Sequence, residues 1–110
     1  MNRREFIRAG AAFGMLPGGL ALADTDMLKK PIPASGEPLP VIGLGTYGVF
    51  NVSSTKANIK ARADIVNALI GAGGSVIDTS PMYERSEEVI GEVLSMNRAR
   101  RNCFLATKVW

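Results

Sequence analysis

The sequence predicts an α/β protein with a parallel sheet, because three short apolar runs alternate with two amphipathic segments. The apolar runs lie at 41–45, 75–79 and 103–109, and apolar residues recur at helical spacing in the segments between them. A strand, helix, strand, helix, strand order implies parallel pairing through right-handed crossovers. Polar and charged side chains follow the second and third runs, where parallel α/β folds place their chemistry.

Composition sets limits on size and on chemistry. The chain has 110 residues, 46% hydrophobic and 21% charged, which is typical of a folded globular protein. A complete eight-stranded α/β barrel needs roughly 250 residues, so this length does not hold one. A single cysteine and no histidine exclude an internal disulfide, a His-based triad and an ordinary zinc site, and we expect no metal.

The first 23 residues are predicted to be a cleaved export signal. They begin with a charged stretch containing Arg3 and Arg4, continue with a Gly/Ala-rich apolar middle, and end in a small-x-small site at Ala21–Ala23. This pattern resembles a twin-arginine signal, so we expect recognition by the twin-arginine export machinery, cleavage after Ala23 and a periplasmic location. An amphipathic N-terminal helix and a permanent anchor are alternatives, but Pro17 opposes the first and a run short of the ~20 residues needed to span opposes the second.

The basic charge also belongs to this segment. Three arginines against one glutamate give residues 1–23 a net charge of +2 out of +3 for the chain, leaving +1 for the remainder. We therefore predict no nucleic-acid surface.

Residues 24–31 are predicted to be an unstructured linker, and residues 31–40 a small hairpin. Four prolines surround a Ser35-Gly36 turn in the second segment, and proline confines such a hairpin to an edge. We expect it to cap the open end of a larger structure.

The run Val41–Gly45 is predicted to be a buried strand, and residues 43–48 match the G-x-G-x-x-G dinucleotide fingerprint. In a Rossmann fold this motif opens a helix directly. Here helical spacing starts only near Ile59, so the context opposes that interpretation. The alternative is a strand end whose glycines let a flat ligand approach the backbone.

Two helices are expected to follow the first two strands. Residues 58–71 place Ile59, Ala63, Val66 and Ile70 at helical spacing, and glycines at 71–74 end the helix. The second helix is predicted to be capped by Ser86. Its apolar positions include Val89, Val93 and Met96, with Ile90 and Leu94 beside them. Residues 98–102 form a charged loop before the third strand.

Asp78, Tyr83 and Lys108 are the candidate catalytic residues, because each follows a predicted strand and such ends converge on one face. A phenol with an ordinary pKa of about 10 is a weak acid at neutral pH. A nearby ammonium would ease proton donation, and a carboxylate would hold that ammonium in place. Taken singly, each residue also has a structural explanation: a helix-entry cap, a half-buried anchor and a surface charge.

Four segments together resemble the N-terminal third of the aldo-keto reductases. They are Gly43-Leu44-Gly45-Thr46-Tyr47-Gly48, Val76-Ile77-Asp78-Thr79-Ser80-Pro81-Met82-Tyr83, Ser86-Glu87-x-x-x-Gly91 and Ala106-Thr107-Lys108-Val109, and the similarity spans residues 32–110. The resemblance implies an N-terminal hairpin plus the first three strands and two helices of a (β/α)₈ barrel. It also implies metal-free reduction of a small carbonyl substrate with NADPH or NADH.

The resemblance assigns roles to individual residues. Tyr83 would be the proton donor, Lys108 its activator and Asp78 the partner of the lysine. Gly45, Thr46, Tyr47 and Asp78 would approach the nicotinamide end of the cofactor.

Two departures limit this assignment. Glu84 stands where many members have glycine after the tyrosine, and the family's catalytic histidine, which follows the fourth strand, has no counterpart. We therefore expect an N-terminal portion of an exported reductase with negligible carbonyl reductase activity alone. The alternatives are a non-catalytic remnant or small binding module and, less favoured, a Rossmann-type dehydrogenase.

Overall fold

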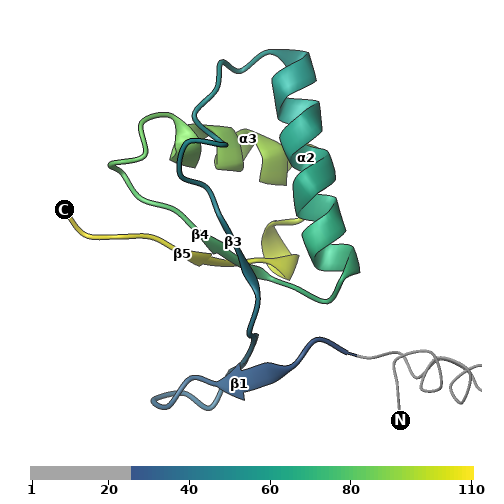
Figure 1. Cartoon of the computed structure of the whole chain (residues 1–110), viewed down its shortest axis with the longest axis vertical. Helices are drawn as coiled ribbons and strands as arrows, with labels where there is room; N and C mark the ends of the chain where they lie inside the picture. The colour runs from purple at the N-terminus through teal and green to yellow at the C-terminus, as the bar shows by residue number, and fades with distance from the viewer. Residues whose placement is uncertain (1–25) are drawn as a thin grey trace, which may run out of the picture.

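The computed structural model describes residues 26–110 and shows a short hairpin beside a parallel sheet that carries two helices (Figure 1). The elements, in order, are β1 Lys29–Pro31, β2 Pro38–Pro40, β3 Gly43–Gly45, α2 Lys56–Gly71, β4 Val76–Asp78, α3 Ser86–Asn97, η1 Arg100–Asn102 and β5 Phe104–Ala106. The predicted export signal at 1–23 lies outside the described residues. Within residues 26–110, neither helix is long and apolar enough to cross a bilayer.

The sheet has the strand order β3-β4-β5, and both pairs are parallel, which confirms the predicted α/β class. Gly45 pairs with Asp78, and Asp78 pairs with Ala106, so the three strands end at the same level of the sheet. The strands are shorter than the apolar runs. Val41 and Ile42 precede β3 and are 42% and 60% exposed, and no residue of β3 is fully buried. The prediction of a buried strand over 41–45 was therefore wrong in its start and in its burial.

Helix α2 begins two residues before the predicted start because Thr55 caps it: the Thr55 hydroxyl accepts from the Asn58 amide at 3.2 Å. Its buried face consists of Ile59, Ala63 and Val66, as predicted. Helix α3 buries Val89, Ile90, Val93 and Leu94, also as predicted. Met96 is 50% exposed, so its place on the buried face was predicted wrongly.

Ser86 is not the cap of α3. The cap position belongs to Arg85, which makes no side-chain capping bond, and Ser86 is the first helical residue. The fully buried Ser86 hydroxyl donates instead to the carbonyl of Thr46, at 3.2 Å. Ser86 therefore joins the start of α3 to the loop after β3.

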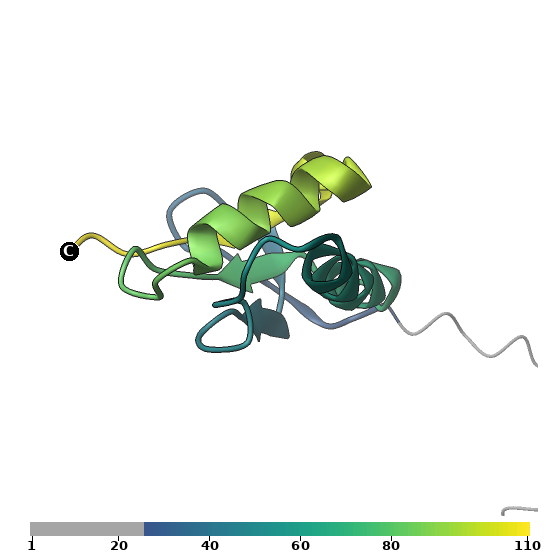
Figure 2. The same cartoon turned by 90° about the horizontal axis from the view of Figure 1, so that it is seen from above.

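The core lies between the sheet and the helices. Ile77 and Phe50 are completely buried in it, and Leu44 and Leu105 pack against its edge. Figure 2 shows α3 lying along one side of the sheet. Since side chains alternate along a strand, the side chains of Asp78 and its level neighbour Ala106 project toward the opposite face.

The hairpin lies beyond the beginnings of the strands, at the end of the sheet away from the candidate site (Figure 1). Strands β1 and β2 pair antiparallel, and the amide of Ile32 donates to the carbonyl of Glu37 across the turn. The hairpin was predicted, but its first strand begins at Lys29, inside the segment expected to be a linker.

Candidate active site

Asp78, Tyr83 and Lys108 come together beyond the carboxyl ends of β4 and β5. The Lys108 Nζ donates to both carboxylate oxygens of Asp78, at 3.1 and 3.0 Å, and to the carbonyl of Thr79 at 2.9 Å. The same nitrogen lies 4.9 Å from the centre of the Tyr83 ring. The geometry therefore assembles a carboxylate, an ammonium and a phenol in one cluster.

Hydrogen bonds from Thr46 and Thr79 hold the backbone around Asp78 in place. Thr46 donates to the Asp78 carbonyl with its amide at 3.1 Å and with its hydroxyl at 3.0 Å. The Thr79 amide donates to the carbonyl of Ala106 at 2.8 Å. Thr46 is completely buried, and its hydroxyl supports the backbone of Asp78.

Tyr47 and Tyr83 pack edge to face from two loops. Their ring centres are 5.1 Å apart at an interplanar angle of 68°, a favourable aromatic arrangement. Tyr47 is 75% exposed, whereas Tyr83 is half-buried. A hollow of about 170 Å³ lies against both rings and is lined further by Gly48, Asn51, Met82 and Glu84. One side of the cluster is thus open to a small molecule.

The Asp78 carboxylate raises the pKa of Lys108 above its ordinary value, with a smaller contribution from the nearby Tyr83. Because the folded-state pKa is the higher one, the pair stabilises the fold below the ordinary lysine range and this contribution is lost as pH rises through the folded pKa. The ammonium is therefore present throughout the neutral range.

We expect Asp78→Asn to move the titration of Lys108 to lower pH, because the carboxylate that favours the charged form is gone. An NMR titration of the Lys108 ε-methylene protons measures this directly. Asp64→Asn, at the exposed pair with Lys60, is the matched control and leaves the Lys108 titration in place. An unchanged Lys108 titration in Asp78→Asn would contradict the pairing.

Gly45 ends β3 at the level of Asp78 and leaves space above the backbone. A Cβ built at Gly45 would meet no atom within 4 Å, so this strand end is open to a ligand. The glycine motif does not open a helix: residues 46–55 form a loop and α2 starts at Lys56. The structure therefore opposes the Rossmann interpretation, which requires a helix N-terminus directly at the motif.

Sequence reasoning missed three contributors to this cluster. The Thr79 carbonyl is the third acceptor of the lysine, Ser86 fixes the loop that carries Tyr47, and Asn51 bonds to the segment just after Tyr83. A backbone acceptor leaves no sequence signal, and Ser86 carried the signal of a helix cap. No group of three potential metal ligands occurs among residues 26–110.

The cluster lies at the strand ends of a parallel α/β unit, and comparison with known proteins shows the family to which such a unit belongs. A family model described as the aldo/keto reductase family matches residues 41–110. The chain belongs to the aldo/keto reductase family. No curated protein matches it by sequence.

Solved structures show the same relationship. A candidate aldo-keto reductase from Pseudomonas aeruginosa is 27% identical with a TM-score of 0.63, and the match covers 82% of this chain and 35% of that one. A crystal structure, also of a candidate aldo-keto reductase from P. aeruginosa, is 28% identical with a TM-score of 0.61, covering 77% and 33%. The Bombyx mori aldo-keto reductase in complex with NADP is 26% identical with a TM-score of 0.55, covering 78% and 28%. The chain thus spans about a third of the length of the structures it matches.

Proposed function

We propose that this chain supplies the proton-donating part of a nicotinamide-dependent carbonyl reductase. The observation that carries the proposal is the contact of Lys108 with both Asp78 and the Tyr83 ring. Family membership and the similarity to an NADP-bound reductase support the same chemistry.

Each residue has a distinct part in the proposed reaction. Tyr83 donates its phenolic proton to the oxygen of a small aldehyde or ketone, and Lys108 stabilises the phenolate that forms. Asp78 holds Lys108 charged and in position. A bound NADPH or NADH supplies the hydride for the carbonyl carbon.

The strand ends suit the nicotinamide end of such a cofactor. Gly45 offers open backbone, Tyr47 offers an exposed aromatic ring, and Asp78 lies level with Gly45. These residues would hold the nicotinamide beside Tyr83. Thr46 would contribute through its support of Asp78. No metal is required by the proposed chemistry.

We further propose that the sheet continues as a (β/α)₈ barrel when further strands are present. The outer edge of β5 pairs with no strand among the described residues. Beside it, a groove of about 460 Å³ is lined by apolar residues including Ile90, Leu94 and Leu105. Thr79 also lines this groove, and its hydroxyl is buried without a hydrogen-bond partner among the described residues. A neighbouring strand and helix would cover all three features.

The 110-residue chain alone is accordingly expected to have negligible carbonyl reductase activity. A non-catalytic remnant or small binding module is the second candidate.

Export is a separate proposal that rests on residues 1–23. Recognition by the twin-arginine machinery and cleavage after Ala23 would place the folded protein in the periplasm. Mass spectrometry of the exported protein is expected to give Asp24 as the first residue. A retained N-terminus in that sample would contradict the proposal.

The functional proposal is tested with a hybrid enzyme. Residues 27–110 replace the matched segment of the B. mori reductase, and oxidation of NADPH is followed with a carbonyl compound that the parent enzyme reduces. We expect measurable turnover by the hybrid and none by the 110-residue chain. A folded, cofactor-binding hybrid without turnover would contradict the proposal.

A further inference from the structure

The segment that carries Tyr83 is closed by short-range turn bonds. It runs from Thr79 to Arg85 between β4 and α3. The Tyr83 amide donates to the Ser80 carbonyl at 3.0 Å, and the Ser86 amide donates to the Tyr83 carbonyl at 2.9 Å. Glu84, directly after Tyr83, has a φ of 51°, in the left-handed region that non-glycine residues disfavour. The turn bond from the Ser86 amide to the Tyr83 carbonyl spans Glu84, and side-chain contacts to this turn would stabilise its conformation further.

Asn51 supplies such contacts from the loop after β3. Its Nδ2 donates to the carboxylate of Glu84, and its Oδ1 accepts from the backbone amide of Arg85 at 3.4 Å. One amide side chain thus holds the two residues that follow Tyr83, one through its side chain and one through its backbone.

Asn51 is itself well anchored. The preceding residue, Phe50, is completely buried, and its amide donates to the Thr46 carbonyl at 3.2 Å. The amide of Asn51 donates to the carbonyl of Gly48 at 3.3 Å. The loop that positions Asn51 is also the loop that carries Tyr47, so Asn51 fixes the two tyrosine-bearing segments relative to each other.

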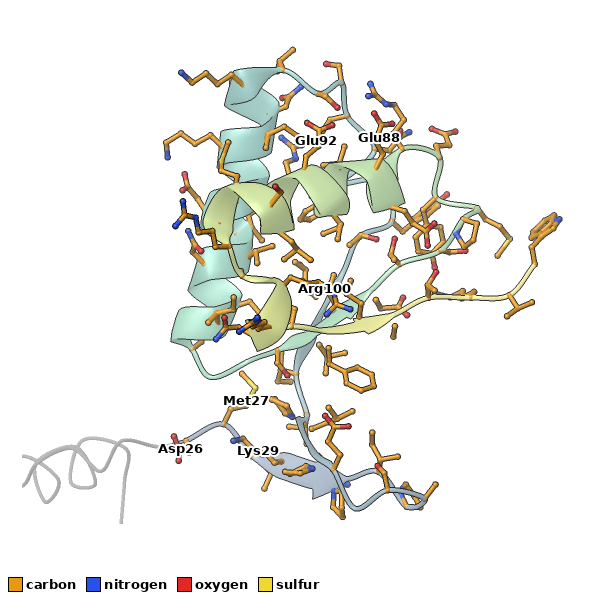
Figure 3. All side chains as sticks on the ribbon, turned by 180° about the vertical axis from the view of Figure 1, so that it is seen from behind. Asp26, Met27, Lys29, Glu88, Glu92 and Arg100 are labelled. Atoms are coloured by element: carbon orange, nitrogen blue, oxygen red, sulfur yellow. The ribbon has the colours of Figure 1, made fainter. Side chains whose placement is uncertain are left out.

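A second set of side-chain hydrogen bonds connects this loop to α3. Arg85 donates to the Ser54 hydroxyl at 2.9 Å and pairs with Glu88, while Ser54 donates to Glu92 at 2.5 Å. Figure 3 labels Glu88 and Glu92 on α3. This set of bonds attaches Arg85 and the start of α3 to the same loop, and it includes no hydrogen bond to Glu84.

We propose that Asn51 is the positioning residue for Tyr83, holding its ring against Lys108 and Tyr47 through Glu84 and the Arg85 amide. The proposal rests on the assignment of Tyr83 as the proton donor, but its test needs no turnover. It also gives Glu84 a role: the charge that replaces glycine after the tyrosine is the acceptor that Asn51 requires.

The test uses NMR of the full 110-residue chain. A methylene group near an aromatic face shifts upfield, so the Lys108 ε-protons, assigned by their loss in Lys108→Met, report the Tyr83 ring. Contacts between ring protons of Tyr47 and Tyr83 report the aromatic pair. Asn51→Ala is expected to lose most of the upfield shift and the ring contacts.

The controls separate positioning from general loosening. Asn58→Ala removes an asparagine that bonds to Ser53 in the same connection, and it is expected to keep both signals. Asn51→Asp places two carboxylates, those of residues 51 and 84, next to each other. We expect this variant to lose both the upfield shift of Lys108 and the ring contacts. Asn51→Asp combined with Glu84→Gln exchanges the donor and the acceptor of the hydrogen bond between residues 51 and 84. The aspartate still offers an acceptor to the Arg85 amide. We expect the double variant to regain both NMR signals.

Several results would overturn the proposal. These are a wild-type Lys108 without the upfield shift, an Asn51→Ala variant that keeps both signals, an equal loss in Asn58→Ala, or no recovery in the double variant. Circular dichroism should show unchanged helix in every variant, and a loss of helix in Asn51→Ala also counts against a role confined to the Tyr83 segment.

Discussion

Replacing Tyr83 by phenylalanine is expected to reduce the carbonyl reductase activity of the hybrid enzyme by about 10²–10⁴-fold, the usual contribution of a positioned general acid. The ring and its packing on Tyr47 are kept, and only the transferable proton is lost. The fall should appear in kcat more than in KM, because the proton is needed in the transition state. Initial rates of NADPH oxidation over a range of substrate concentrations give both constants.

Tyr47→Phe is the matched control, since the two rings are in contact and only Tyr83 has Lys108 over its face. We expect less than about a tenfold change in kcat for this variant, well below the effect of losing a general acid. Equal losses in the two variants would show that the hydroxyl of Tyr83 has no special part in the reaction.

The largest effect on stability is expected at Phe50. Its side chain is completely buried in the core, and truncation of such a phenylalanine to alanine typically costs about 3–5 kcal/mol. A fold of this size has little stability to spare, so Phe50→Ala should be largely unfolded at room temperature. Urea unfolding followed by circular dichroism measures the change.

Val49→Ala is the control for this variant, because Val49 is the preceding residue and is 52% exposed. It should lower the free energy of unfolding by less than about 1 kcal/mol, as is usual for surface positions. A Phe50→Ala variant that unfolds at the same urea concentration as the wild type would contradict the burial of this side chain.

The sequence predicted the parallel sheet and the main contacts of the candidate site for a simple reason. Strands of a parallel sheet end on the same side, so Asp78 and Lys108, which follow neighbouring strands, were expected to meet, and the structure joins them at 3.0 Å. Helical spacing likewise predicted the buried positions Val66 and Val89.

Other features depended on contacts that no local pattern reveals. Ser86 has the sequence signature of a cap, but its hydroxyl bonds to a residue 40 positions earlier. The apolar pair Val41 and Ile42 predicted burial, but β4 begins opposite Gly43, so no strand pairs with the residues before it. The partnership of Asn51 with Glu84 spans 33 positions and requires the left-handed backbone at Glu84.

The central claim is that Tyr83 and Lys108 act as one proton-donating unit, and a double-mutant cycle in the hybrid enzyme tests it. Tyr83→Phe, Lys108→Met and the double variant are compared by kcat/KM for NADPH-dependent carbonyl reduction. Residues that act as a unit give strongly non-additive losses, so the double variant should lose no more than about tenfold beyond Tyr83→Phe. Losses that multiply, as for independent sites, would contradict the account.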